Sequence, residues 1–255
     1  MDRKVIRSES ATKAQILDAA IRLFGDRSFD AVSVRDITSK AKANLGAVNY
    51  HFVSKLNLIR EVLKTLASPI NEARLTSLNA YETSLNGGRP DLETLIRILV
   101  EPFVRLAKDR GGRGIYYPRL MMLARTLPGD LIGSYLSEQH DAMARQFVKA
   151  IGRALPNLDE EEIFWRYDFA IGSTLNIVGD AYRSHRLRRL SGGQCDTDDA
   201  DRIVDELVAF VSAGMRGAAP ARRKKPLMAR ATAPKAAKNG ERRQANRVRA
   251  KQAAQ

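Results

Sequence analysis

The stretch that most constrains the fold is residues 33 to 59, which read SVRDITSKAKANLGAVNYHFVSKLNLI and contain three helix-start signals in close succession. Ser33 and Asp36 have the spacing of a capping box, with Asp in place of the usual Glu or Gln. Asn44 and Ser54 are the next residues suited to cap a helix N-terminus. Two short helices joined by a few residues are the geometry of a helix-turn-helix. The same pattern also suits three short helices that pack as a plain globular subdomain.

The residues within this stretch favour the helix-turn-helix. Asp36-Ile37-Thr38, Gly46-Ala47-Val48-Asn49 and Tyr50-His51-Phe52-Val53-Ser54-Lys55, followed by Leu58, resemble the DNA-binding domain of the TetR family of transcriptional regulators. The resemblance covers about residues 12 to 59. Three positions depart from the family pattern: Lys42 stands where Gly usually makes the turn, Thr38 replaces Ala, and Asn49 replaces an aromatic residue. We expect Lys42 either to avoid a positive φ or to adopt it at a cost in strain.

The resemblance implies that the helix at residues 44 to 50 enters the major groove of DNA. Asn49 can bond bidentately to adenine, and Leu45 and Ala47 can contact a thymine methyl group. Other side chains are candidates for phosphate contacts, which fix the register without reading sequence: Ser33, Asn44, Tyr50, His51 and Lys55. His51 also suits a packed or capping role, whereas Val48 and Phe52 are expected in the core.

Hydrophobic periodicity along the rest of the chain predicts an all-α fold. We expect a flexible N-terminal arm at 1–11, the helix-turn-helix domain at 12–66, and a larger helical ligand-binding and dimerisation domain at 67–216. Helices are predicted at about 12–25, 54–68, 70–85, 91–108, 115–125, 128–154, 160–189 and 200–216. A break or a kink is predicted at Ser68-Pro69, because Pro disfavours the helical conformation of the residue before it.

Positive charge gathers at the C-terminal end. The chain of 255 residues has a net charge of +14, and residues 217–255 contain twelve Lys or Arg and a single acid, Glu241. A segment so rich in Lys, Arg and Ala is expected to be disordered. It could add salt-sensitive, sequence-independent affinity for DNA, or it could be a solvated extension. If the tail dominated binding, the chain would be an architectural, DNA-coating protein, which is the alternative function.

The larger helical domain combines aromatic and Met side chains with a few polar groups, which suits a mostly apolar ligand cavity. Alternatively, these side chains form ordinary core. The candidates for contact with an unknown small-molecule effector are Phe103, Tyr116, Tyr117, Arg119, Met122, Arg125, Tyr167 and Asn176. Arg119 or Arg125 could meet an acidic head group. Helices 160–189 and 200–216 resemble the dimerisation helices of the family, which implies a homodimer through about 160–216 on a near-palindromic operator.

Other classes of function find little support. His51, His140 and His185 lack metal-ligand spacing, and residues 196–207 lack the Gly and Glu of a calcium loop. We therefore expect no catalytic site, metal or cofactor. The chain has no run of 18 apolar residues and no apolar segment at its N-terminus, so we expect neither a membrane span nor a signal peptide. A single cysteine, Cys195, fits a reducing cytoplasm. The sequence predicts a ligand-responsive, TetR-like repressor.

Overall fold

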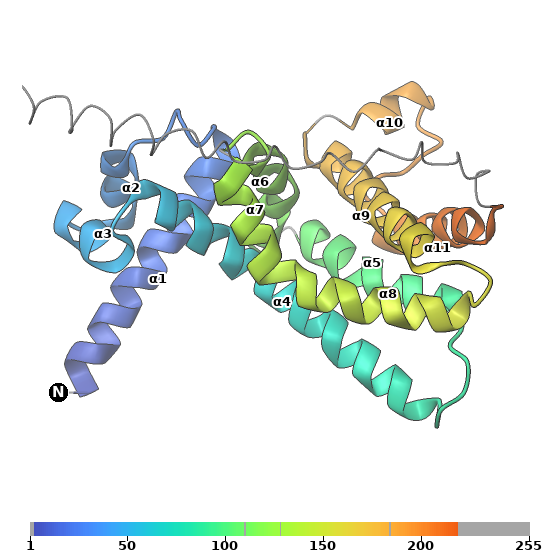
Figure 1. Cartoon of the computed structure of the whole chain (residues 1–255). Helices are drawn as coiled ribbons and strands as arrows, with labels where there is room; N and C mark the ends of the chain where they lie inside the picture. The colour runs from blue at the N-terminus through green and yellow to red at the C-terminus, as the bar shows by residue number, and fades with distance from the viewer. Residues whose placement is uncertain (1–2, 110, 128, 184, 219–255) are drawn as a thin grey trace, which may run out of the picture. The chain divides into compact units, whose positions relative to one another are not determined.

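The computed structural model describes residues 3–109, 111–127, 129–183 and 185–218, and these residues form helices and connecting loops without any strand. The predicted all-α fold is confirmed. Residues Met1–Ala219 cluster as one compact unit (Figure 1). Most of the predicted tail, from residue 219 onward, lies outside the described residues. The α-helices are α1 (Arg3–Asp26), α2 (Val34–Ala41), α3 (Leu45–Phe52), α4 (Lys55–Ser84), α5 (Leu92–Lys108), α6 (Tyr117–Ala124), α7 (Gly129–Leu136), α8 (Ala142–Ala154), α9 (Glu160–Arg183), α10 (Arg186–Leu190) and α11 (Ala200–Arg216).

The three predicted helix starts in the N-terminal region are confirmed. The Ser33 hydroxyl accepts from the backbone N–H of Asp36 while the Asp36 carboxylate accepts from the backbone N–H of Ser33, which completes the capping box. Asn44 caps α3 and Ser54 caps α4 through their side-chain oxygens. Helix α1 packs against both α2 and α3. Its buried residues Ile16, Ala20 and Phe24 hold the two short helices in place.

Helix α1 begins at Arg3 and not at Thr12, so the segment 1–11 that we predicted to be flexible is helical from residue 3. This expectation was wrong. The segment before Thr12 contains neither Pro nor Gly. Without such a residue, a helix that is held by packing further along can extend in the N-terminal direction at little cost.

Helix α4 runs without interruption through Pro69, so of the two predicted alternatives, a break or a kink at Ser68-Pro69, the break is wrong. Buried residues on both sides of the proline, including Leu66, Ala67 and Ile70, keep the two halves of the helix against the core. The Ser68 hydroxyl donates to the Lys64 carbonyl at 3.0 Å within this turn. Packing outweighs the single backbone hydrogen bond that Pro69 removes. The domain boundary predicted between residues 66 and 67 therefore falls inside one continuous helix.

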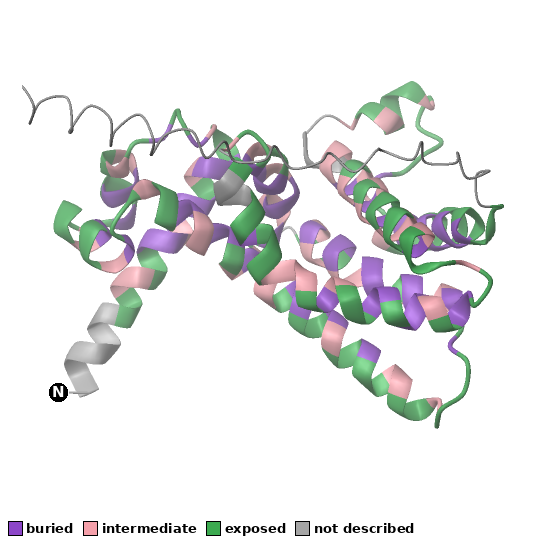
Figure 2. Ribbon diagram, in the orientation of Figure 1, coloured by how far each residue is buried: buried purple, intermediate pink, exposed green. Residues whose placement is uncertain are grey.

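The helices after α4 build the second half of this unit. Helix α4 packs against α5, α6 and α8, and α11 packs against α5 and α9. Burial follows these contacts, with buried positions where helices face one another and exposed positions on the outer faces (Figure 2). Ion pairs between Arg97 and Asp205 at 2.7 Å and between Arg105 and Asp201 at 2.9 Å join α5 to α11. Helix α5 is thus central, with α4 on one side and α11 on another.

The helix predicted at 160–189 is divided in two. Helix α9 ends at Arg183, and His185 adopts a left-handed conformation with φ of 42° before α10 begins. The Asp180 carboxylate accepts from the backbone N–H groups of Arg186 and Leu187 and so caps the new helix. This local hydrogen bonding competes with continuation of the helix, and the sequence periodicity did not reveal it.

Helices α7 and α8 are joined by a π-helical turn, η2 (Ser137–Asp141), within one helical run. The run matches the helix predicted at 128–154. Single π-helical turns are rare and occur frequently at functional sites. A short 3₁₀ turn, η1 (Gly114–Tyr116), precedes α6.

Candidate functional site

The turn between α2 and α3 sets the direction of α3. Lys42 has φ of 52° and ψ of 36°, the left-handed conformation, and the backbone N–H of Ala43 donates to the Thr38 carbonyl at 3.0 Å. This hydrogen bond is typical of a Schellman ending, in which Gly is the preferred residue. Lys42 therefore carries the strain that we expected if it adopted a positive φ.

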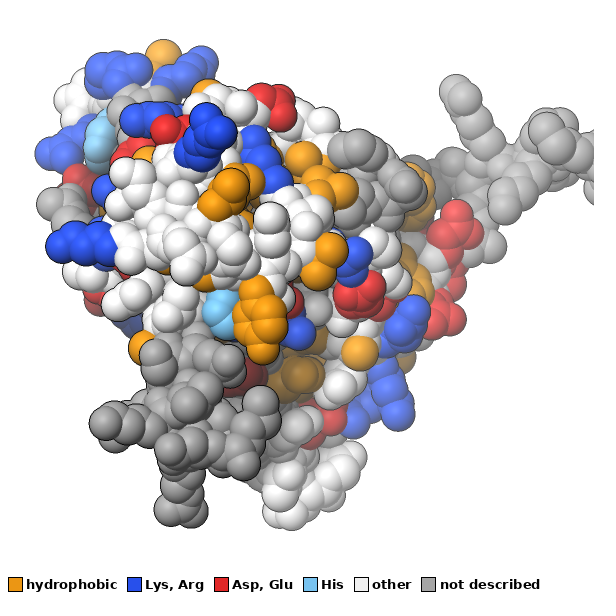
Figure 3. Space-filling view, turned by 90° about the vertical axis from the view of Figure 1, so that its left-hand side faces the viewer, with side chains coloured by type: hydrophobic (Ala, Val, Ile, Leu, Met, Phe, Trp, Pro, Cys, Tyr) orange, Lys and Arg blue, Asp and Glu red, His pale blue; other side chains and the backbone are white. Residues whose placement is uncertain are grey.

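Helix α3 presents one face to the outside and one to the core. Val48 and Phe52 are 1% and 3% exposed, as predicted, whereas Leu45 and Tyr50 are 47% and 70% exposed. Asn49 is exposed beside them. Viewed from this side, hydrophobic and His side chains adjoin each other between Lys and Arg side chains (Figure 3). The outer face of α3 is thus free to enter a groove.

Two residues that we predicted to contact DNA are less available than expected: Ala47, a predicted base contact, and Ser33, a predicted phosphate contact. Ala47 is half-buried against the core, so its methyl group is less accessible than that of Leu45. Both donors of Ser33, its hydroxyl and its backbone N–H, are directed at the Asp36 carboxylate at 2.7 and 2.8 Å. These hydrogen bonds lower the pKa of Asp36. Ser33 would have to break the capping box to donate to a phosphate.

The other phosphate candidates lie near the start of α4. Lys55 is the first residue of α4, and Tyr50 and His51 stand at the end of α3 with ring centroids 5.1 Å apart. The Asn44 amide oxygen caps α3 by accepting from the backbone N–H of Ala47 at 2.7 Å, which leaves the Asn44 NH₂ group free to donate. Helix N-termini favour phosphate because their N–H groups are unpaired. Asn44 thus lies at the N-terminus of α3, Tyr50 and His51 lie at its C-terminal end, and Lys55 begins the next helix.

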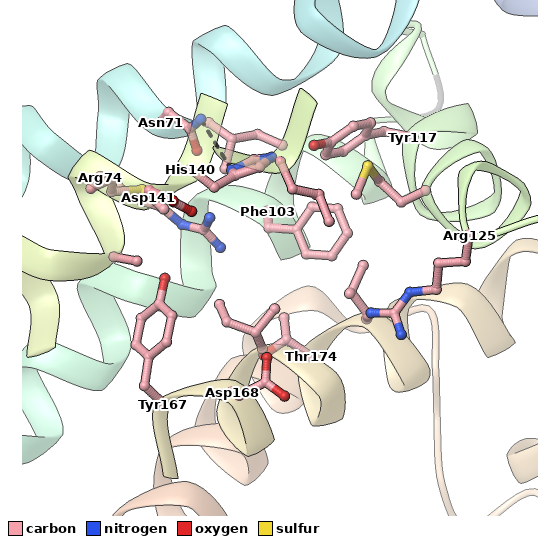
Figure 4. Close-up of a pocket in the computed structure, with 17 residues that line it drawn as sticks. Asn71, Arg74, Phe103, Tyr117, Arg125, His140, Asp141, Tyr167, Asp168 and Thr174 are labelled. Atoms are coloured by element: carbon pink, nitrogen blue, oxygen red, sulfur yellow. Dashed lines mark hydrogen bonds between the residues drawn. The ribbon is translucent and has the colours of Figure 1, made fainter. Parts of the chain in front are cut away.

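A cavity of about 230 Å³ lies among α4, α5, α6, η2, α8 and α9 (Figure 4). Four of the eight predicted ligand contacts line it: Phe103, Tyr117, Arg125 and Tyr167. Tyr117, Met121 and Arg125 are spaced by four residues, which places them on one face of α6 and its C-terminal end. The sequence therefore identified one wall of the cavity.

The other four predicted contacts lie elsewhere. Tyr116 packs over Gly25 at the end of α1, so closely that a Cβ at Gly25 would lie 2.2 Å from its ring. Arg119 donates to the Arg27 carbonyl at 2.9 Å. Met122 is 57% exposed. Asn176 faces a separate groove between α9 and α11. These residues fall on other faces of their helices, which composition alone could not distinguish.

Sequence reasoning missed six polar residues in the cavity wall: Asn71 and Arg74 of α4, His140 and Asp141 of η2, and Asp168 and Thr174 of α9. A signal for Arg74 was present. Ile70, Arg74 and Leu78 are spaced by four residues, so Arg74 lies within the buried stripe of α4. The His140 position depends on the π-helical turn, which shifts the following residues around the helix and leaves no mark in the hydrophobic pattern.

Burial dominates the protonation equilibria in this cavity. It lowers the pKa of Arg74, and together with the charge of Arg74 it lowers the pKa of His140 to about 4. Burial also raises the pKa of Tyr117 to about 12. At neutral pH His140 is therefore a neutral imidazole and Tyr117 a neutral phenol beside the Arg74 guanidinium.

The described residues contain neither a candidate metal site nor a candidate membrane span. Within these residues, no group of three or more His, Cys, Asp or Glu side chains is placed to hold a metal ion. Among the same residues, no helix combines the length and apolar character needed to cross a membrane.

Family models match both halves of the chain. The model for "Bacterial regulatory proteins, tetR family" matches residues 16–62, and the model for "Tetracyclin repressor-like, C-terminal domain" matches residues 97–214. Together these segments cover more than half of the 255 residues. The chain belongs to the TetR family. The first segment contains α2, α3 and the C-terminal part of α1 of this TetR-family protein, and the second contains most of the cavity wall.

Curated relatives support the assignment. The HTH-type transcriptional regulator AcrR of Shigella flexneri is 33% identical over 75 residues, which are 29% of this chain and 35% of that protein. The matched stretch thus spans about a third of the length of this relative. The HTH-type transcriptional repressor KstR2 of Mycolicibacterium smegmatis is 22% identical over 157 residues, 61% of this chain and 73% of that protein.

Solved structures show the same fold. The TetR family transcriptional regulator PfmR from Thermus thermophilus has a TM-score of 0.55 at 15% identity, over 80% of this chain and 98% of that one. The fatty acid degradation regulator FadR from Bacillus halodurans has a TM-score of 0.53 at 15% identity, over 81% of this chain and 99% of that one.

Proposed function

We propose that this protein is a ligand-responsive transcriptional repressor that binds a near-palindromic operator as a homodimer. One observation carries the proposal: a single continuous helix, α4, begins at the helix-turn-helix and continues into the wall of the cavity. Lys55 stands at its first turn, and Asn71 and Arg74 lie in the cavity wall further along it. A ligand in the cavity would thus act on the element that supports the DNA-binding helices.

The proposed DNA contacts are those that remain accessible on and around α3. Leu45 and Asn49 face outward and would contact base edges, while Asn44, Tyr50, His51 and Lys55 would contact phosphates. Ala47 would have a minor role because it is half-buried. Ser33 would act chiefly as the cap of α2.

Exposed aromatic side chains support the proposed dimer. Trp165 and Phe169 of α9 are 57% and 62% exposed, and Phe210 of α11 is 70% exposed. Trp165 and Phe169 are one helical turn apart, with ring centroids separated by 6.0 Å. Exposed apolar groups of this size on two neighbouring helices are typical of an interface. A two-fold pair through α9 and α11 would place two copies of α3 on one operator.

The π-helical turn η2 supports a route from the cavity to α4. Arg60 of α4 donates to both carboxylate oxygens of Glu138 at 2.8 and 2.9 Å, and Asn71 donates to the Gln139 carbonyl at 2.9 Å. His140, the next residue, lines the cavity. A ligand that displaced η2 would therefore pull on α4 close to its DNA-binding end. Repression is released only if the ligand prefers the form with lower operator affinity.

The DNA-contact part of the proposal is tested by two matched lysines of α4. Lys55 is at the start of the helix, and Lys64 is exposed nine residues later. Each phosphate contact contributes about 0.9 to the slope of log affinity against log salt. Lys55→Ala should reduce that slope by about one unit in a titration of operator DNA, whereas Lys64→Ala should leave it unchanged. Equal slopes for both variants and the wild type would remove Lys55 from the interface.

A further inference from the structure

The guanidinium of Arg74 is buried at the cavity without an acidic partner. Arg74 is 6% exposed, and its Nε donates to the Leu99 carbonyl at 2.6 Å. Among the described residues, no carboxylate oxygen lies within 4.0 Å of its guanidinium. By contrast, the exposed arginines Arg97 and Arg105 of α5 each form an ion pair with an acid. A buried cation is ordinarily paired. Arg74 is therefore a buried cation without an ion-pair partner among the described residues, and it could bind an anion.

Asp141, one of the two acids in the cavity wall, already has partners. The Asp141 carboxylate accepts from the Ser137 hydroxyl at 2.7 Å and lies 3.6 Å from the Arg145 guanidinium. Asp168 is exposed and lies across the cavity from Arg74, on the side where the exposed Arg125 enters (Figure 4). Neither acid forms an ion pair with Arg74 within 4.0 Å. Among the described residues, Arg74 therefore has no paired carboxylate, and the anion of a bound ligand would supply one.

His140 and Asn71 place unsatisfied polar atoms in the same wall. The Asn71 NH₂ group donates to the Gln139 carbonyl at 2.9 Å and lies 3.4 Å from His140 Nδ1. With Nδ1 as acceptor the imidazole proton is on Nε2, which has no hydrogen-bond partner. This tautomer follows from the hydrogen-bond network. The wall thus offers a neutral N–H donor from His140 in addition to the charged donors of Arg74.

The remaining wall limits the size and charge of the guest. Phe103, Met121, Ile171 and Leu175 supply apolar surface. The volume of about 230 Å³ is below the range of about 300 to 1,000 Å³ common for drug-sized ligands. One buried cation balances one negative charge. A phosphate dianion or a dicarboxylate would lack a second buried cation.

We propose that the cavity binds a small monocarboxylic acid with an apolar body, whose carboxylate is held by Arg74 with His140 beside it. Charge-assisted hydrogen bonds from guanidinium to carboxylate are among the strongest in proteins. That the bound acid is the effector rests on the function proposed above. That the cavity binds the acid does not rest on that function.

The test is isothermal titration calorimetry of the full-length protein with a panel of acids and their uncharged primary amides. The panel contains hexanoate, octanoate, decanoate, 3-phenylpropanoate and 4-phenylbutanoate. At least one acid should bind the wild type more than about tenfold more tightly than its amide. This comparison uses only the wild-type protein, so it does not depend on whether a variant folds. The better of the two series, aliphatic or aromatic, identifies the body.

Two variants assign the preference to Arg74. Arg74→Met should reduce the acid-to-amide ratio to near one, and Arg97→Met, which removes an exposed ion-paired arginine, should leave it unchanged. Amides that bind as tightly as acids would overturn the inference. So would an Arg74→Met protein that keeps the preference, or the absence of binding by every acid up to about 1 mM.

Operator binding by the same preparation separates this inference from the proposed function. Specific DNA binding without acid binding would contradict the inference alone. Acid binding without specific DNA binding would contradict the proposed function and leave the inference standing.

Discussion

At the residue scale, Lys42 stores strain in the turn between α2 and α3. Its left-handed conformation, with φ of 52°, costs a residue with a Cβ about 1 to 2 kcal/mol. Lys42→Gly should therefore raise the free energy of unfolding by about 1 kcal/mol, because part of the relief is offset by the greater freedom of Gly in the unfolded chain. Urea denaturation at neutral pH measures the change.

The control is Lys40→Gly, at an exposed position in the last turn of α2. There Gly should destabilise by up to about 1 kcal/mol, because the position is helical. Opposite signs for the two variants support the observed turn. A loss of stability in both would mean that Lys42 does not hold the left-handed conformation in solution.

His140 predicts a pH dependence of stability. Its pKa is lowered to about 4 in the folded protein by burial and by Arg74, whereas an unfolded chain has the ordinary value near 6.5. Between these values the unfolded state binds more protons, so stability is lost as pH falls from about 6.5 to 4, by up to about 3 kcal/mol. His140→Gln should show a shallower loss over this window in thermal denaturation. Identical profiles for the two proteins would contradict the buried, neutral imidazole.

Capping residues were predictable from the sequence, whereas polar residues in the cavity were only partly so. Ser33, Asn44 and Ser54 each accept from the N–H group three residues away, and such local chemistry is visible in the sequence. Arg74 could have been found from its place in an apolar stripe. His140 could not, because its direction depends on a π-helical turn that is fixed by packing against α4.

At the element scale, the tie between η2 and α4 should transmit ligand binding to the DNA-binding end. Glu138→Gln weakens the contact with Arg60, an exposed ion pair of the kind worth about 0.2 to 1 kcal/mol. The fold-change in operator affinity caused by the best-binding carboxylate should then fall by up to about fivefold. Fluorescence anisotropy of labelled operator DNA, with and without the acid, measures this coupling.

Glu82→Gln provides the matched control. Glu82 lies near the far end of α4 and pairs with Arg153 of α8 at 3.1 Å. Because this pair is remote from the helix-turn-helix, its loss should not alter the coupling. If the two variants reduced coupling equally, η2 would have no special role. If neither did, the route would lie elsewhere, with the α6 contact from Arg119 to the Arg27 carbonyl as the next to examine.

Element boundaries were less predictable than the elements themselves. Helix α4 passes through Pro69 because buried side chains on both sides hold it, and the helix predicted at 160–189 divides because Asp180 caps α10. In both cases an interaction that hydrophobic periodicity does not encode, tertiary packing at Pro69 and a side-chain cap at Asp180, decides between two allowed conformations. Periodicity identifies the apolar face of a helix but does not weigh such competition.

At the scale of the whole molecule, Met1–Ala219 is the unit that should be sufficient for regulation. Arg166 of α9 donates to the carbonyls of Met215 and Gly217 at the end of α11, at 2.5 and 2.9 Å. A truncation that ends at residue 219 keeps these contacts, whereas one that ends at 216 would lose the Gly217 contact. The basic residues beyond 219 would add salt-sensitive affinity without sequence preference.

The central claim is specific DNA binding by this unit. The most direct measurement is the affinity of full-length protein and of residues 1–219 for a site selected from random DNA, against the scrambled site, at about physiological salt. We predict that residues 1–219 bind as a dimer and prefer the selected site by about 10³ or more. Equal affinity for both DNAs, with binding abolished by the truncation, would contradict the account and identify the protein as a DNA-coating protein that binds through its basic tail.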